Sequence, residues 1–358
     1  MPGVYISYPF CAQKCTYCNF ASGVFPLAIE SQYLAALHAE IGQQEWLWRP
    51  ETVYLGGGTP SALAPDLLAD LLGRIPGRPW MEATIEAAPG SITVQKARVW
   101  VEAGVDRVSL GVQSFVQREI NGTGRKHTPE TVASDIKMLH DCGIRKINID
   151  LIAGLPGQTE ASWEQSLGWI ADLKPDHVSV YMLEVDDDSR LGREILAGGS
   201  RYGATIRPSD ELTADLYETA VERLRVLGIF RYEISNFARP GHESRHNLKY
   251  WNLESYAGFG ADAHSFDGRY RWQNPESITD YLGAPRPERI EADPLEEHFF
   301  VGLRLARGIR PDAREWRHFG EPIRRFLEQG LLETDGQTLR LTDRGVMLSN
   351  EVFQEFVT

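Results

Sequence analysis

The stretch VYISYPFCAQKCTYCNF, residues 4–20, places a short apolar run directly before three of the chain's four cysteines. Its first four residues, VYIS, have the composition and length of a buried β-strand. Cys11, Cys15 and Cys18 follow with the spacing C-x3-C-x2-C. The sequence therefore predicts a strand that leads into a loop rich in thiols.

Five more runs have the same strand-like character, and segments with helical spacing separate them. The six predicted strands are VYIS (4–7), TVYLG (52–56), TIEAA (84–88), RVSLGV (107–112), KINIDLI (146–152) and HVSVYML (177–183). In the first intervening segment, QYLAALHAEI places Leu34, Leu37 and Ile41 on one face of a helix. Strands that alternate with helices in this way predict an α/β fold with a parallel sheet.

The bulk composition narrows the class of protein. The 358 residues predict a main domain and a smaller one, and 42% hydrophobic residues allow a large core. No apolar run approaches the roughly 18 residues of a membrane span, and the N-terminus lacks a basic leader, so we expect a cytoplasmic protein. A net charge of −13 argues against a nucleic-acid partner, because binding phosphates requires a basic surface.

The cysteine spacing favours a metal centre over a disulfide framework in a reducing compartment. A structural zinc ion takes four protein ligands. The fourth cysteine, Cys142, lies at a predicted helix end, where we expect a small buried apolar role. Three thiolates on a cubane iron-sulfur cluster would leave one iron open to a small molecule, whereas a zinc ion completed by a distant histidine is the alternative.

The cysteine motif, with Tyr17 before the last cysteine, resembles the signature of radical S-adenosylmethionine (SAM) enzymes, in which the open iron of a 4Fe-4S cluster binds SAM. Further motifs follow in the order found in one subgroup, the HemN and HemW family. They are YLGGGTPS (54–61), IEAAPG (85–90), SLGVQSF (109–115), GRKHT (124–128), NIDLIAGLPGQT (148–159), YEISNFARPGHESRHNLKYW (232–251) and GFGADAHSF (258–266). This resemblance covers most of residues 4–270 and implies a partial (β/α)6 radical SAM barrel.

Two features distinguish the branches of this family. HemN, a coproporphyrinogen dehydrogenase, has a further cysteine two positions after the third and an N-terminal extension. Here that position is Phe20, and the first predicted strand begins at Val4. The segment HNLKYW (246–251) is similar to the HemW branch, whose members bind heme and pass it to heme-requiring proteins. The resemblance thus implies a heme chaperone whose partners are heme-acceptor proteins such as respiratory enzymes. Any contact with the membrane would be peripheral and made through those partners.

The resemblance also assigns residues to the cofactors. Cys11, Cys15 and Cys18 would hold the 4Fe-4S cluster as thiolates. The residues assigned to SAM are Tyr5, Tyr17, Gly57, Gly58, Thr59 and Glu86, and those at the spacing of a second SAM in HemN are Gln113, Arg125 and Asp150. Glu86, Gln113 and Asp150 also fall at the carboxyl ends of predicted parallel strands, where barrels place their chemistry.

His246 is the candidate axial ligand for heme, since imidazole nitrogen suits iron. The segment HNLKYW also fits a packed aromatic turn, which is the structural alternative. His127, His177 and His264 are competing candidates for the same role.

The C-terminal part has a different pattern. The proline-broken stretch GAPRPER (283–289), with Pro285 and Pro287, precedes LEEHFFVGLRLARGI (295–309), which predicts an amphipathic helix ending at Gly308. Residues 323–356 predict a helix, a strand, a hairpin at Asp335-Gly336, a second strand and a helix. That order is winged-helix-like and α+β.

Winged helices often bind DNA, so a DNA-binding metal sensor is one alternative function. Glu328, Glu333 and Asp335 surround the predicted wing, and acidic residues there disfavour phosphate contact. We therefore expect a docking or lid domain.

These expectations divide the chain into a radical SAM barrel (1–235), a connecting segment with HNLKYW (236–284) and a winged-helix-like domain (285–358). We expect the barrel to retain SAM cleavage without coproporphyrinogen oxidase activity. The enzymatic alternatives are HemN-type decarboxylation of coproporphyrinogen III to protoporphyrinogen IX and heme ring opening by a related radical SAM enzyme.

Overall fold

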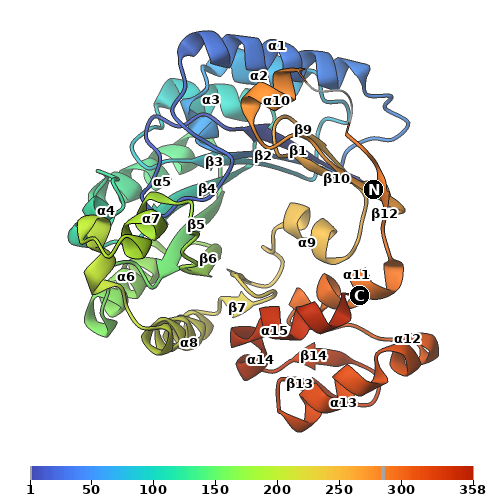
Figure 1. Cartoon of the computed structure of the whole chain (residues 1–358). Helices are drawn as coiled ribbons and strands as arrows, with labels where there is room; N and C mark the ends of the chain where they lie inside the picture. Colours follow the sequence, from blue (N-terminus) through green and yellow to red (C-terminus); the bar gives the residue numbers. More distant parts are fainter. Residues whose placement is uncertain (1, 284–286, 358) are drawn as a thin grey trace.

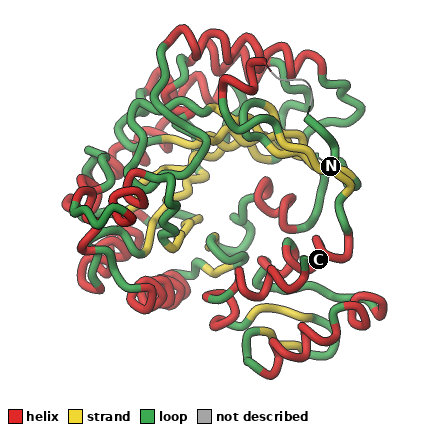
Figure 2. Tube along the Cα trace, in the orientation of Figure 1, coloured by secondary structure: helices red, strands yellow, loops and turns green. Residues whose placement is uncertain are grey.

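A curved sheet of twelve strands dominates the computed structural model, which describes residues 2–283 and 287–357. The strand order is β12-β11-β10-β9-β1-β2-β3-β4-β5-β6-β8-β7. Figure 2 shows the strands as one curved layer, with helices covering its outer, convex side. This arrangement is a partial barrel whose concave side is left free of those helices.

The six predicted strands are present and mutually parallel in the centre of the sheet. They are β1 (Gly3–Tyr8), β2 (Thr52–Gly57), β3 (Glu82–Ala87), β4 (Arg107–Gln113), β5 (Lys146–Ala153) and β6 (His177–Met182). The register of β1 with β2 runs from Gly3 opposite Thr52 to Tyr8 opposite Gly57. The ends of these two strands, and the loops that follow them, therefore lie side by side.

The helices between these strands pack on the convex face (Figure 1). They are α1 (Leu27–Gln43), α2 (Pro65–Gly73), α3 (Val94–Glu102), α4 (Gln117–Gly122), α5 (Pro129–Cys142) and α6 (Glu160–Leu173), followed after β6 by α8 (Asp210–Val226). The short helix α7 (Arg190–Leu196) lies instead against the cysteine-bearing loop, where the Leu191 N–H donates to the Thr16 carbonyl (2.8 Å). Leu34, Leu37 and Ile41 of α1 are buried, as their spacing predicted. Thr128 and Thr159 form capping boxes at the starts of α5 and α6, so the last residues of two family motifs begin helices.

The chain after residue 229 extends the sheet at both edges. On one side β7 (Phe230–Arg231) and β8 (Asn236–Ala238) add to β6, with β8 antiparallel to it. On the other side β9 (Tyr256–Phe259) pairs in parallel with β1, and β10 (His264–Phe266), β11 (Tyr270–Gln273) and β12 (Ile290–Glu291) follow as antiparallel strands. The short helix α10 (Ile278–Gly283) lies against α1.

One helix lies on the concave side, between the sheet and the C-terminal domain (Figure 1). This helix, α9 (Arg245–Trp251), contains the whole HNLKYW segment. The buried Glu82 carboxylate, at the start of β3, accepts hydrogen bonds from the backbone N–H groups of Arg245 (3.1 Å) and His246 (3.0 Å) and from the Ser244 hydroxyl (3.2 Å). A carboxylate at a helix N-terminus satisfies otherwise unpaired donors, so Glu82 anchors α9 across the amino ends of the strands.

The C-terminal domain combines short helices with a two-stranded hairpin, as predicted. Its elements are α11 (Pro294–Phe300), α12 (Ala313–His318), α13 (Gly320–Glu328), β13 (Leu332–Thr334), β14 (Leu339–Leu341), α14 (Asp343–Met347) and α15 (Ser349–Phe353). Phe299, Phe319 and Phe356 stack with ring centroids 4.6–5.2 Å apart and form its aromatic core. At the hairpin turn, the Asp335 side chain accepts hydrogen bonds from the backbone of Gln337 and Thr338.

The predicted helix ending at Gly308 is wrong in its length. The helix α11 ends at Phe300, and Leu305 forms an isolated antiparallel bridge to Glu233. A 3-10 turn (Gly302–Arg304) follows, and Leu305 then has extended backbone angles (φ −71°, ψ 131°), so the helix does not continue. Burial of Leu305 in extended backbone thus overrides the helical spacing.

Two further expectations concern membrane-spanning helices and the boundary between the domains. In the described part of the chain, none of the helices combines the length and apolar character needed to cross a membrane. Pro285, which marks the predicted domain boundary, lies outside the described residues.

Replacing Glu82 by Ala is expected to lower the free energy of unfolding by about 3–5 kcal/mol, because buried donors of α9 and the nearby buried Arg107 lose their acceptor. Urea denaturation of the full chain measures this loss. The exposed Glu45→Ala is the matched control and should change stability by less than about 0.5 kcal/mol. Equal stability of both variants would contradict the anchoring role of Glu82.

Candidate functional site

The three clustered cysteines lie on the loop that follows β1, at the carboxyl edge of the parallel strands. All are unpaired and partly buried. The Cys11 N–H donates to the Gly23 carbonyl (2.8 Å) and the Gly23 N–H donates to the Pro9 carbonyl (2.9 Å), so the two ends of the loop are joined. Its middle is fixed as well, because the Thr16 N–H donates to the Thr123 carbonyl (3.3 Å).

The glycine-rich turn after β2 packs directly on this loop. The Gly58 N–H donates to the Tyr8 carbonyl (2.8 Å) and the Thr59 N–H donates to the Phe10 carbonyl (2.9 Å). A Cβ atom on Gly58 would lie 2.7 Å from the Phe10 oxygen and 2.9 Å from Cys11 Sγ. Only glycine allows this approach, and the predicted turn and the predicted metal ligands are therefore neighbours.

A cation lies beside the second cysteine. Arg125, from the segment between α4 and α5, interacts with the Cys15 side chain and with Tyr17, and its Nη1 donates to the Gly111 carbonyl (2.8 Å). Its Nε is buried and has no protein partner. A guanidinium at this place stabilises thiolate charge, as a cluster of Cys11, Cys15 and Cys18 requires.

Within the described residues, no group of three or more His, Cys, Asp or Glu side chains converges closely enough to hold a single metal ion. Cys15 and Cys18 are both close enough to Cys11 to interact with it electrostatically, so the three thiols lie near one another. The three neighbouring thiols, the glycine turn packed against Cys11 and the nearby Arg125 fit an iron-sulfur cluster at this loop.

Glu86 lies beside the same glycine turn. Its carboxylate accepts hydrogen bonds from the Tyr54 hydroxyl (3.0 Å) and the Gly57 N–H (3.1 Å). Burial, together with the nearby charge of Asp150, raises the pKa of Glu86 to about 7. Tyr5 lies close to Tyr54, with ring centroids 6.1 Å apart, so both tyrosines line the wall beneath the turn.

The three residues predicted for a second SAM come together across β4, β5 and the segment before α5. Asp150 accepts hydrogen bonds from Ser109 (3.1 Å) and Asn148 (2.7 Å), and burial raises its pKa. Gln113 has a φ of 71°, an unusual value for a residue other than glycine. The vacant Cβ position of Gly111 lies 3.2 Å from Gln113 Nε2 and 3.5 Å from Arg125 Nη1. Strain at a strand end is typical of functional sites.

The structure places His246 far from the cysteine loop. It lies in α9, and its two ring nitrogens contact the Thr52 hydroxyl (2.8 Å) and the Tyr250 hydroxyl (2.7 Å). Burial lowers the pKa of His246 to about 3. Thr52 begins β2 and Gly57 ends it. About 17 Å of strand therefore separates His246, beside Thr52, from the glycine turn next to the cysteine loop. Ligation of heme iron by His246 stays a prediction, and it requires one of these hydrogen bonds to break.

The competing histidines have equally different surroundings. His177 is buried, with its ring nitrogens against Asn148 (2.6 Å) and Tyr232 (2.9 Å). His127 Nε2 contacts the Val112 carbonyl (3.1 Å), and burial lowers its pKa to about 4. His264 is exposed on β10. Cys142, predicted to be structural, packs against the hydrophobic core at the end of α5.

Two groups of polar residues were missed by the sequence analysis. Ser109, Asn148 and Ser179 form a hydrogen-bonded set inside the barrel beside Asp150. Glu82 anchors α9, and its spacing from Glu86 on one strand could have shown that both carboxylates face inward. A contact between residues far apart in the sequence, such as that of Glu82 with α9, leaves no comparable spacing pattern.

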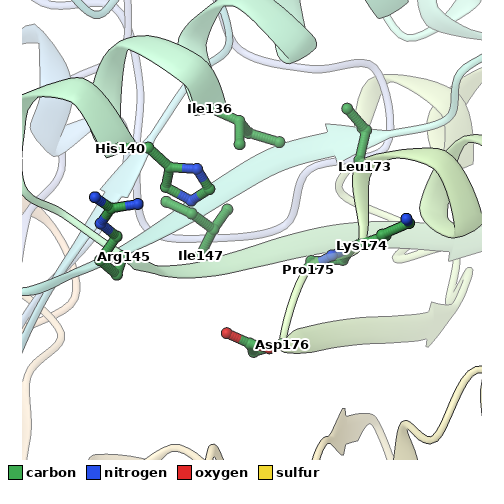
Figure 3. Close-up of a pocket in the computed structure, with 8 residues that line it drawn as sticks. All are labelled: Ile136, His140, Arg145, Ile147, Leu173, Lys174, Pro175 and Asp176. Atoms are coloured by element: carbon green, nitrogen blue, oxygen red, sulfur yellow. The ribbon is translucent and has the colours of Figure 1, made fainter.

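A small hollow of about 190 Å³ lies at the amino ends of β5 and β6, and Figure 3 shows the residues that line it. His140 of α5 and Arg145, which precedes β5, line it together with Asp176, which precedes β6. These residues lie at the amino ends of the strands, and none of them was predicted for the site.

Comparison with known proteins identifies both parts of the chain. The Radical SAM superfamily model matches residues 5–170, and the HemN C-terminal domain model matches residues 291–348. A protein named heme chaperone HemW from Lactococcus lactis is 34% identical, with 99% of this chain and 96% of that protein covered. Proteins of the same name from Mycobacterium tuberculosis (36% identical, 98% and 93% covered) and Escherichia coli (33%, 99% and 97%) are similar over the same extent.

A solved structure shows the same fold. Coproporphyrinogen III oxidase (HemN) from Escherichia coli superimposes with a TM-score of 0.85, covering 100% of this chain and 90% of that one at 23% identity. This likeness establishes the radical SAM fold with its C-terminal domain, as the sequence predicted.

Replacing Cys11, Cys15 or Cys18 by Ala is expected to abolish binding of about four iron atoms per chain after anaerobic reconstitution, because a cubane with two protein thiolates is not retained. Iron and acid-labile sulfide analysis measures the loss. Cys142→Ala is the matched control and should keep its iron. Full iron content in any of the three variants would contradict the ligand assignment.

Proposed function

The chain belongs to the HemW family of the radical SAM superfamily, and because of that membership we propose that it is a heme chaperone, which binds heme and transfers it to heme-requiring proteins. The observation that supports this function is similarity to proteins named heme chaperone HemW over 98–99% of the chain in three bacteria. We propose that the acceptors are heme proteins such as respiratory enzymes, and that the chaperone works in the cytoplasm, where thiols stay reduced.

The cofactors of the superfamily have suitable residues here. Cys11, Cys15 and Cys18 would hold a 4Fe-4S cluster, which when bound supplies the electron for reductive cleavage of SAM. The turn at Gly57, Gly58 and Thr59 packs directly on the cysteine loop through backbone hydrogen bonds, so it lies next to the thiols. We propose that this turn, Tyr5, Tyr17 and Glu86 bind SAM.

We propose that a second SAM, if one binds, contacts Gln113, Arg125 and Asp150. These side chains converge at the carboxyl ends of β4 and β5, and Arg125 offers a buried Nε without a protein partner. Arg125 has a second role, because it also interacts with the Cys15 side chain. The group therefore suits a chain that keeps SAM chemistry.

HemN-type decarboxylation of coproporphyrinogen is the second candidate function, because the fold is similar to HemN throughout. Phe20 stands where the resemblance places the further cysteine of HemN, and its side chain is 66% exposed at the edge of the cysteine loop. A phenyl ring can neither donate a proton nor bind metal. This substitution favours the chaperone over the decarboxylase.

DNA binding is not supported by the C-terminal domain's charge. At the hairpin, Arg340 is paired with Glu333 (2.5 Å), and Asp335 lies at the tip of the turn. We propose that this domain acts in docking, with no nucleic-acid partner.

An anaerobic titration of the reconstituted protein with heme, beside an assay with coproporphyrinogen, SAM and a reductant, tests the proposed function. We expect binding of about one heme per chain and no formation of protoporphyrinogen, since the chaperone holds its cargo without converting it. Formation of protoporphyrinogen and carbon dioxide would instead establish the decarboxylase, and an opened tetrapyrrole would establish ring cleavage.

The affinity for SAM is expected to increase about tenfold between about pH 6 and about pH 8, because the pKa of Glu86 is raised to about 7 and only its ionised form attracts the SAM cation. In Glu86→Gln the affinity should be low and independent of pH. Calorimetric titration of the cluster-loaded protein with SAM measures it, and Glu102→Gln, at an exposed position, should behave as the wild type. A pH dependence that survives in Glu86→Gln would exclude this carboxylate as its source.

A further inference from the structure

A row of buried polar side chains crosses the inside of the barrel, one level below Asp150. The sheet register sets Ser109 of β4, Asn148 of β5 and His177 of β6 side by side. Asp150 lies two residues after Asn148 on β5, so both side chains point to the same face of the sheet. Asn148 and His177 are only 4% and 1% exposed, and each of their polar atoms therefore needs a partner within the protein.

The contacts of Asn148 show which end of its amide faces Asp150. Asn148 Nδ2 lies 2.7 Å from Asp150 Oδ1 and 2.7 Å from Ser109 Oγ. Its Oδ1 lies 2.6 Å from His177 Nδ1. An ionised carboxylate can only accept hydrogen bonds, so the amide nitrogen faces Asp150 and the amide oxygen faces His177. The amide oxygen is also an acceptor only, so the proton between these two side chains belongs to His177 Nδ1.

The other ring nitrogen of His177 leads to the same assignment from the opposite direction. His177 Nε2 lies 2.9 Å from the Tyr232 hydroxyl, which accepts the backbone N–H of Ser244 at 3.3 Å. The hydroxyl therefore directs its own proton to Nε2, and a neutral imidazole that accepts at Nε2 carries its proton at Nδ1. Burial lowers the pKa of His177 well below its usual value, so the ring is neutral. Both directions thus assign one tautomer.

A second chain of hydrogen bonds holds the same amide. Ser179 Oγ accepts from Asn148 Nδ2 at 3.0 Å and donates to Asn236 Oδ1 at 2.8 Å. The Asn236 amide nitrogen donates in turn to the buried carboxylate of Glu233. The segment 232–236, which begins one of the family motifs, therefore fixes the Asn148 amide by two routes.

We propose that His177 is a positioning residue, which in its Nδ1–H tautomer orients the Asn148 amide and so holds the Asp150 carboxylate in one orientation for a ligand. The inference rests on the proposed binding of SAM at Gln113, Arg125 and Asp150, and it names the residue that prepares this site. SAM offers ribose hydroxyls and an ammonium group as donors to a carboxylate. A carboxylate that is already oriented loses less conformational freedom on binding, and the affinity is correspondingly higher.

Equilibrium dialysis of the full-length, cluster-loaded protein against radiolabelled SAM tests this role. We expect a second, weaker class of SAM site in the wild type, and at least about tenfold weaker binding to it in both Asp150→Asn and His177→Phe, because each leaves buried polar atoms without a partner. His177→Asn, whose amide nitrogen can replace Nδ1 as the donor, should bind within about threefold of the wild type. His140→Phe, at the outer hollow of Figure 3, is the matched control and should not change binding.

A purely structural role for His177 would not produce this pattern. The iron content, circular dichroism and affinity of the first SAM site should be the same in all four variants. Wild-type SAM binding in His177→Phe, beside weaker binding in Asp150→Asn, would overturn the positioning role and leave the proposed SAM site intact. A single class of SAM site in the wild type, or wild-type binding in Asp150→Asn, would contradict that SAM site and this role with it. Neither outcome affects the heme-chaperone function, which the heme titration tests separately.

The tautomer can be measured without any variant that perturbs folding. Histidine-selective 15N NMR of the wild type should show a protonated Nδ1 and an unprotonated Nε2 for His177, because the contacts on both sides of the ring require this form. A protonated Nε2 would overturn the proposal, even if His177→Phe did not fold.

Discussion

Parallel, in-register pairing of β1 and β2 is the constraint on which the cysteine site depends. It sets Tyr8 opposite Gly57, so the loops that leave both strands start from one edge. The Gly58 N–H then bonds the Tyr8 carbonyl at 2.8 Å, and Gly58 has no side chain to displace Cys11. A shift of β2 by one residue would turn Tyr54 to the other face of the sheet, because side chains alternate along a strand. The geometry of the sheet thus decides whether these thiols can serve a shared centre.

At the opposite edge of the sheet, buried polar contacts hold α9 against the amino ends of the strands. Glu82, Thr52 and His246 are buried together, and each has a partner in α9 or in the adjoining strand. Burying such groups costs free energy unless all of them are hydrogen-bonded. Their full pairing therefore fixes the position of α9, which ends at Trp251.

Sequence patterns predicted what is local and missed what depends on distant segments. Alternating β-branched and apolar residues predicted all six parallel strands. The assignment of Arg125 and Asp150 to a second SAM came from the family resemblance and stays a prediction. The helix expected to end at Gly308 failed because tertiary packing of Leu305 overrides helical spacing. The pairing of His298 with Glu315 joins two helices whose contact no periodicity reveals, so neither residue was predicted.

A chain of ring contacts makes the effect of mutating His246 ambiguous, and this affects how a heme ligand can be identified. Tyr54, His246, Tyr250 and Trp251 follow one another with ring centroids 5.1–6.2 Å apart, from Glu86 to the end of α9. Removing His246 would leave Thr52 and Tyr250 without their partner and would loosen the helix that holds Trp251. Weaker heme binding in such a variant is thus expected whether or not His246 touches iron. Restoration of the heme Soret band by added imidazole depends only on iron ligation, so it separates a ligand from a residue that supports α9.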